Sequence, residues 1–135
     1  MRPCRHVTMI LMPLLLLLLA VFPACSKKTG SIIEGEWTVR VNFPGNDPSD
    51  LFLRFEGDDE AGSVYNQKGT QLGSYTLTRP TLKFTVQIYY NEFSGNLVYL
   101  FSGALADDTH MAGTLIGYFS NFPQATLNGT WSGTR

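Results

Sequence analysis

The stretch TLKFTVQIYY, residues 81–90, decides the fold because it alternates along its whole length. Its even-numbered residues, Leu82 to Tyr90, are apolar or aromatic, whereas its odd-numbered residues, Thr81 to Tyr89, are mostly polar. Successive side chains of a strand point to opposite faces, so this period of two predicts a β-strand with one buried face. Beyond residue 31, no stretch of ten residues shows the period of a helix.

The same alternation recurs in seven other stretches, separated by breaks rich in Gly, Pro, Asn, Asp and Ser, which favour turns. The expected strands cover residues 35–43, 51–57, 61–67, 71–79, 81–90, 96–105, 109–118 and 126–134. Eight consecutive strands with short links favour an all-β, antiparallel, up-and-down barrel, because closure removes both exposed edges of the sheet. A two-sheet β-sandwich is the alternative, since alternation is compatible with both architectures.

One local pattern, bulky–any–Gly–any–bulky, occurs four times and supports closure. The copies are Ile33 to Trp37, Phe101 to Leu105, Met111 to Leu115 and Leu127 to Trp131. In a strand, the glycine and both bulky residues of each copy point the same way. An inward glycine opens space opposite bulky side chains and lets the strand bend sharply.

Two of these copies carry a family resemblance. Gly35-Glu36-Trp37 resembles the Gly-x-Trp motif that opens lipocalins, and Gly129-Thr130-Trp131 is similar to the glycine-tryptophan repeats of avidin-type barrels. Both families are calycin-like barrels, so the resemblance implies a ligand-holding barrel. In lipocalins an arginine of the last strand packs over the motif tryptophan, and Arg135 is the candidate for that role here. No polar set matches the biotin contacts of avidin.

The first 24 residues have the layout of a bacterial secretion signal, which predicts a signal helix ahead of the barrel. Arg2 and Arg5 precede an apolar run over residues 7–22, which is shorter than the roughly 20 residues of a membrane span. Residues 22–26, FPACS, resemble the lipobox of bacterial lipoproteins, in which the cysteine is acylated and becomes the mature N-terminus. An ordinary secreted protein and an uncleaved anchor are the alternatives.

Acylation is therefore expected at Cys25, with palmitate-type chains that hold the protein on the membrane. The resulting organisation is a signal peptide over residues 1–24, a lipidated tether over 25–31 and a β-barrel domain over 32–135. Ser26, rather than Asp, follows the cysteine, which by resemblance implies an outer-membrane lipoprotein facing the periplasm or the surface of the cell envelope.

The composition of the mature domain disfavours several classes of function. Removing Arg2 and Arg5 leaves 8 basic against 11 acidic residues, a net charge of −3, which argues against nucleic acid as a partner. His110 is its single histidine, no cysteine follows Cys25, and no cofactor or metal motif is present. We therefore expect no enzyme activity, no cofactor and no metal site. An acidic hairpin turn is a better explanation than a calcium loop for residues 57–62.

An up-and-down meander places alternate turns at opposite ends of the barrel. One end has long aromatic loops and is expected to form the mouth of a pocket or a surface for a partner. Its candidate residues are Phe43, Tyr90, Phe93, Phe119 and Phe122. The other end has short acidic turns, and there Trp37 and Trp131 are expected to plug the bottom of the barrel.

These predictions lead to two hypotheses about function. In the first, an envelope lipoprotein binds an apolar or amphipathic small molecule in a cavity lined by inward side chains. The candidates for this lining are Phe55, Phe84, Val86, Tyr99 and Phe101. In the second, a filled barrel acts as a structural or inhibitor-like module that contacts an envelope protein through its loops. A cavity of several hundred Å³ would favour the first hypothesis, and a packed interior the second.

Overall fold

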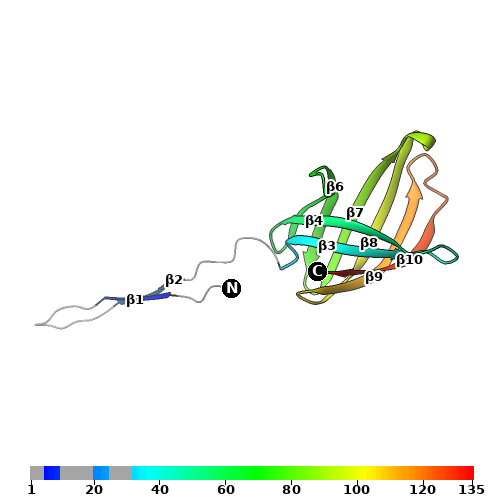
Figure 1. Cartoon of the computed structure of the whole chain (residues 1–135). Coiled ribbons are helices and arrows are strands. Elements are labelled where there is room, and N and C mark those ends of the chain that lie inside the picture. The colour runs from blue at the N-terminus through cyan, green and yellow to red at the C-terminus, as the bar shows by residue number, and fades with distance from the viewer. Residues whose placement is uncertain (1–4, 10–19, 25–31) are drawn as a thin grey trace, which may run out of the picture.

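Eight antiparallel strands form a closed barrel in the computed structural model, which describes residues 5–9, 20–24 and 32–135 (Figure 1). Each strand lies beside its neighbour in the sequence, and the last closes on the first. The strands are β3 (Gly35–Asn42), β4 (Ser49–Gly57), β5 (Ala61–Tyr65), β6 (Gln71–Thr78), β7 (Thr81–Tyr90), β8 (Gly95–Asp107), β9 (His110–Phe119) and β10 (Leu127–Thr134). The up-and-down barrel predicted from the alternation is confirmed, and the sandwich alternative is not.

Closure is made by main-chain pairing between β10 and β3. The register runs from Thr130 opposite Asn42 to Thr134 opposite Thr38. On its other side β10 pairs with β9 from Leu127 opposite Gly117 to Thr134 opposite His110. Every strand of the barrel therefore has a neighbour on both sides, which removes the long exposed edges of an open sheet.

Glycines allow the strands to approach each other closely where the wall bends. Gly103 of β8 lies directly opposite Gly113 of β9. A Cβ on Gly113 would collide with the backbone oxygen of Ser102 and would lie 2.5 Å from the Cα of Gly103. Any larger residue would therefore require the backbone to move, which agrees with the inward glycines expected from the repeated pattern.

The interior of the barrel holds the hydrophobic core. The buried side chains come from every barrel strand and from the segment that leads into β3. They are Ile33, Trp37, Val39, Val41, Leu53, Phe55, Val64, Tyr75, Leu77, Leu82, Phe84, Val86, Phe101, Met111, Leu115 and Trp131.

The two described pieces of the leader are strands, where a signal helix was expected. β1 (Arg5–Met9) and β2 (Ala20–Ala24) form a separate antiparallel two-stranded sheet. β-branched and aromatic residues such as Val7, Thr8, Val21 and Phe22 favour strands, and Pro23 disfavours the interior of a helix. Cys25 and the tether over residues 25–31 lie outside the described residues. Within the described part of the chain, no helix has the length and hydropathy needed to cross a membrane.

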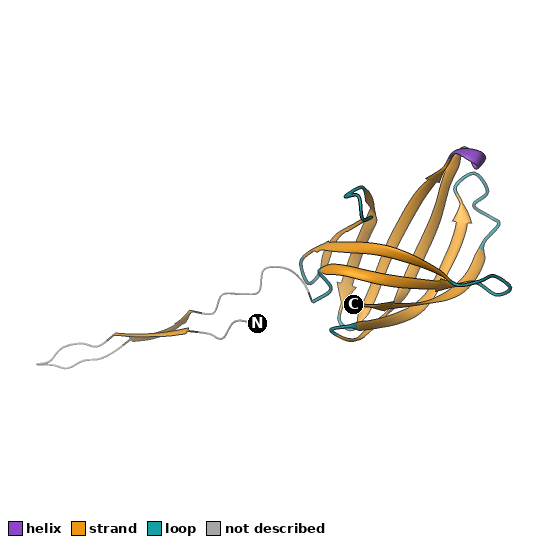
Figure 2. Ribbon diagram, viewed as in Figure 1, coloured by secondary structure: helices purple, strands orange, loops and turns teal. Residues whose placement is uncertain are grey.

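The connections divide between two ends of the barrel, as the meander predicts. We call one end the mouth; it carries the loops over residues 43–48, 66–70, 91–94 and 120–126. The 3-10 helix η1 (Asn91–Phe93) lies in one of these loops (Figure 2). We call the other end the base; it carries the short turns over residues 58–60, 79–80 and 108–109.

Candidate functional site

The middle of the barrel is filled by aromatic rings rather than hollow. Phe84 and Phe101 stack with centroids 4.2 Å apart, and Phe55 meets Phe84 edge-on at 5.1 Å. Phe55, Phe84, Val86 and Phe101 are at most 2% exposed. Four of the five residues expected to line a cavity therefore form the packed core, and Tyr99 alone of the five retains exposed surface.

Trp131 belongs to this aromatic core and does not share a plug with Trp37. Its ring contacts Phe84 at 5.2 Å and Phe101 at 5.6 Å, both edge-on. Trp131 lies opposite Val41 in the register, four residues along β3 from Trp37. The expectation of two tryptophans at the base needs this correction, because the stagger between β3 and β10 places Trp131 further up the barrel.

Tyr99 and Phe43 meet at the mouth, above the packed aromatic core. Their ring centroids are 5.9 Å apart, and Tyr99 also contacts Phe101 edge-on at 5.9 Å. Burial raises the pKa of the Tyr99 phenol, and the nearby Tyr90 adds to the rise. The phenol therefore stays neutral at physiological pH. Among the residues that the structure describes, none forms a hydrogen bond with the Tyr99 hydroxyl.

Two glycines provide the space that the Phe43 and Tyr99 rings occupy. A Cβ on Gly117 would lie 3.1 Å from both rings, and a Cβ on Gly129 would lie 2.8 Å from Cδ1 of Phe43. Phe43 therefore folds inward over β9 and β10 and covers the core. Beside it lies a solvent-open hollow of about 440 Å³, lined by Asn42, Phe43, Pro44, Asn128, Gly129 and Thr130.

A second aromatic cluster forms the rim of the mouth. Phe119 lies 4.7 Å from Phe93 and 6.2 Å from Tyr90, measured between ring centroids. Phe93 is 49% exposed, and Phe122 in the next loop is 61% exposed. The five residues expected at the mouth are therefore found there, with Phe43 turned inward and the others retaining exposed surface.

Polar contacts hold the two rim loops together. Asn121 Nδ2 donates hydrogen bonds to the carbonyl oxygens of Phe93 at 2.8 Å and Ser94 at 3.2 Å. The backbone amide of Asn96 donates to the hydroxyl of Ser120 at 2.9 Å. The exposed rings are thus presented on connected loops, a common arrangement at binding surfaces.

Residues that the sequence analysis did not select also contribute to the mouth. Leu51, Leu72 and Ile88 are partly buried and pack against the core from β4, β6 and β7. The alternation over residues 81–90 marked Ile88 as inward, but it carried no information on the distance of Ile88 from the mouth.

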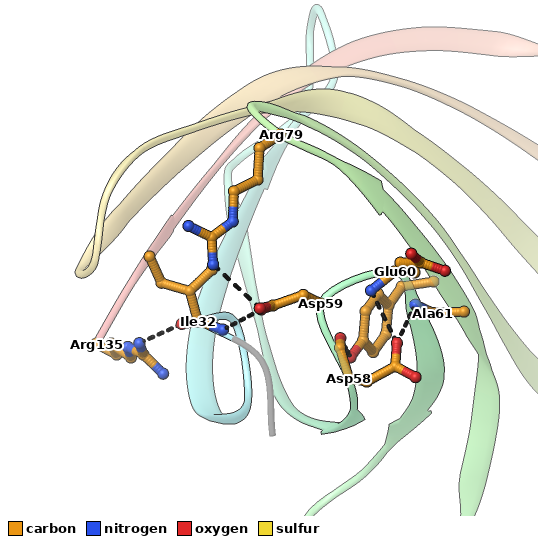
Figure 3. Close-up of polar contacts among 8 residues, drawn as sticks. Ile32, Asp58, Asp59, Glu60, Ala61, Arg79 and Arg135 are labelled. Carbon is orange, nitrogen blue, oxygen red and sulfur yellow. Dashed lines mark hydrogen bonds and ion pairs between the residues drawn. The ribbon is translucent and has the colours of Figure 1, made fainter. Parts of the chain in front are cut away.

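The base is closed by Arg135 and Trp37. The Arg135 guanidinium lies over the indole ring, with Cζ 4.6 Å from the centroid, as the lipocalin resemblance implied. It also donates hydrogen bonds to the carbonyl oxygens of Ile32 at 2.6 Å (Figure 3), Glu34 at 2.6 Å and Asp108 at 2.7 Å. Arg135 therefore joins the end of β10 to the segment that enters β3.

Acidic residues of the base act as acceptors within their own turns. Asp58 accepts the backbone N–H groups of Ala61 and Glu60, which lowers the pKa of its carboxyl (Figure 3). Hydrogen bonds from the Thr109 backbone, from His110 and from the Thr109 hydroxyl lower the pKa of Asp107 to about 2. Within the described residues, no three acidic, histidine or cysteine side chains are grouped to hold a metal.

Replacing Arg135 by Ala is expected to lower the free energy of unfolding by about 1–3 kcal/mol. The change removes three hydrogen bonds and the contact with Trp37, and it leaves that indole open to water. Urea unfolding followed by tryptophan fluorescence measures the effect.

Arg79→Ala is the matched control for Arg135→Ala at the same end of the barrel (Figure 3). Arg79 makes one ion pair with Asp59 at 3.1 Å, and both side chains are more than half exposed, so its loss should cost less than about 1 kcal/mol. Equal losses in the two variants would contradict the role given to Arg135.

Comparisons with known proteins support the fold alone. No family model and no curated protein matches the chain. EF1p2_mFAP2b, solved bound to DFHBI, matches with a TM-score of 0.57 and 16% identity, over 77% of this chain and 94% of that one. A redesigned β-barrel, b11L5F_LGL, matches with a TM-score of 0.50 and 18% identity, over 77% and 91%. The chain thus shares the architecture of small closed β-barrels.

Proposed function

We propose that the protein is a non-catalytic envelope lipoprotein whose barrel binds an apolar or amphipathic small molecule at its mouth. The hollow of about 440 Å³ beside Phe43 carries the proposal, because it combines space with an aromatic wall. From the sequence we expected the site in the interior of the barrel. Because aromatic rings pack the middle of the barrel, we propose the site at the mouth instead.

The chemistry of the mouth favours a ligand with an apolar body and one polar acceptor. Phe43 and Tyr99 offer ring surfaces, which bind apolar groups by removing them from water. The Asn128 amide lines the hollow, makes no hydrogen bond to other described residues, and is available to donate one to a ligand. EF1p2_mFAP2b, which shares this architecture, is bound to DFHBI, so a barrel of this kind can hold a small molecule.

The location rests on residues 22–26. In the proposal, the signal is removed before Cys25, lipid chains on Cys25 hold the protein in the outer membrane, and residues 26–31 link it to the barrel. The chain enters the barrel at the base, where Ile32 is bound by Arg135. The mouth at the opposite end would then face away from the membrane that holds the anchor.

The exposed rim favours a second candidate function, contact with an envelope protein through the loops. Phe93 and Phe122 present large apolar rings on loops connected by Asn121. Rings of this kind often serve as central contacts of protein interfaces. This function does not use the hollow, so variants at Asn128, which lines the hollow, distinguish it from binding of a small molecule.

Binding at the mouth is expected to show in a titration of the full chain with 1-anilinonaphthalene-8-sulfonate, an amphipathic aromatic probe. The wild-type protein should enhance the probe fluorescence, and Asn128→Ala, which removes an amide that lines the hollow, should weaken binding by about five- to tenfold through loss of one hydrogen bond. Tyr89→Phe is the control, since Tyr89 lies on the outer face and is 62% exposed. Absence of enhancement, or equal behaviour of the two variants, would contradict the proposal.

Lipidation is expected at Cys25 and not at Cys4. Intact mass spectrometry of the protein from its bacterial host should show a chain that begins at Cys25 and carries acyl groups. Cys25→Ser should abolish the added mass, whereas Cys4→Ser should leave the mature protein unchanged. A mature chain without acyl groups would overturn the anchor and favour an ordinary secreted protein.

A further inference from the structure

A groove of about 280 Å³ lies on the outer wall of the barrel, separate from the mouth hollow. It crosses β10, β3 and β4, which run side by side in Figure 1, and the loop over residues 66–70 borders it. Thr134, Thr38 and Phe52 form one row across these strands, because each lies opposite the next in the register. We call this feature the outer groove.

The loop beside β4 forms the wall of the outer groove. The pairing of β5 with β4 ends at Tyr65 opposite Arg54, and the chain then turns beside the first half of β4. Asn66 Oδ1 accepts the backbone N–H groups of Lys68 and Thr70, both at 2.9 Å. These bonds fix the turn, so the groove is a formed feature of the surface.

Phe52 provides an aromatic platform within the groove. Its side chain is on the outer face of β4 and is 50% exposed, whereas the inward residues Leu53 and Phe55 are at most 3% exposed. Ligand pockets combine aromatic side chains with a few polar groups, and Phe52 supplies the aromatic part here. The ring presents a flat apolar face with negative electrostatic character, which attracts the C–H groups of a ligand.

Polar side chains surround the platform with both donors and acceptors. Glu36, Thr38, Gln67 and Thr134 line the groove, and their side chains make no hydrogen bond to other described residues. They therefore offer a carboxylate, two hydroxyls and an amide to a ligand.

Both arginines that line the groove are already engaged, so the Glu36 carboxylate is the charge left for a ligand, which disfavours an anionic ligand. Arg54 has its Nε 2.9 Å from Glu56 Oε1, and its Cζ lies 5.0 Å from the Tyr65 ring centroid. Arg40 and Asp50 form the opposed pair two residues along β3 and β4 from Thr38 and Phe52. They bind each other through two contacts of 2.8 and 3.1 Å. A ligand with an apolar face and several neutral hydroxyls fits this combination.

We propose that the outer groove binds a neutral saccharide. A pyranose ring has a face of C–H groups that packs on Phe52, and its hydroxyls both donate and accept hydrogen bonds, as the surrounding side chains require. The groove volume is near the lower limit of small-molecule pockets, so it fits a mono- or disaccharide. This site shares no residue with the mouth hollow or the aromatic rim, and it does not depend on the function proposed there.

Titration of the full chain, in a detergent without a sugar headgroup, tests this site. The probes are glucose, galactose, N-acetylglucosamine, cellobiose, maltose and diacetylchitobiose, and binding is measured by isothermal calorimetry. At least one sugar should bind with a Kd below about 5 mM, in the range of weak specific binding. Phe52→Ala should weaken that binding by at least about tenfold, and Gln67→Ala by about threefold.

Two controls keep the result interpretable. Phe52→Trp retains the aromatic platform and should retain binding, which separates loss of the platform from misfolding. Leu100→Ala removes an exposed apolar side chain from β8, outside the outer groove, and should have no effect. The proposal is overturned if all six sugars bind more weakly than about 5 mM, or if Phe52→Ala binds like the wild-type protein.

Discussion

The main-chain pairing of β10 with β3 is the interaction on which the rest of the structure depends. It turns a meander of eight strands into a closed wall, so the inward side chains of all strands face one another. It also brings Trp131 against Phe84 and Phe101, and Arg135 over Trp37. If these strands separated, two sheet edges and the aromatic core would be exposed to water.

Closure of so small a barrel determines where function can be located. Eight strands enclose an interior that side chains can fill, and here aromatic rings fill it. We therefore propose ligand binding where the packing ends, at the mouth beside Phe43, and where a turn lies against the outer wall, beside Phe52. The base serves a different purpose, since Arg135 and the turn aspartates bind backbone groups there.

The sequence predicted the strands well because alternation and turn residues are local signals. Each barrel strand lies within about two residues of its expected bounds, and the order of turns assigned the mouth and the base. The height of a side chain along the barrel axis was not predictable in the same way. We expected Trp131 at the base, and this was wrong because its height depends on the stagger between the first and last strands. Only the closed structure defines that register.

The candidate sites were only partly predictable, because alternation gives the direction of a side chain and not its height in the barrel. Alternation identified inward residues such as Phe84 and Tyr99, but it did not show that only Tyr99 lies above the packed core. The outer groove escaped prediction because Phe52 is ordinary as an outward residue of a strand. Its environment arises from the loop after Tyr65, which the structure places alongside β4.

Solution NMR of the full chain tests barrel closure most directly, through nuclear Overhauser contacts between β3 and β10. A closed barrel predicts cross-strand contacts between backbone protons of residues 39–41 and residues 131–133, with Val41 opposite Trp131 and Val39 opposite Gly133. A protein with the other strand pairs intact but without these contacts would be an open sheet, and that result would contradict the account.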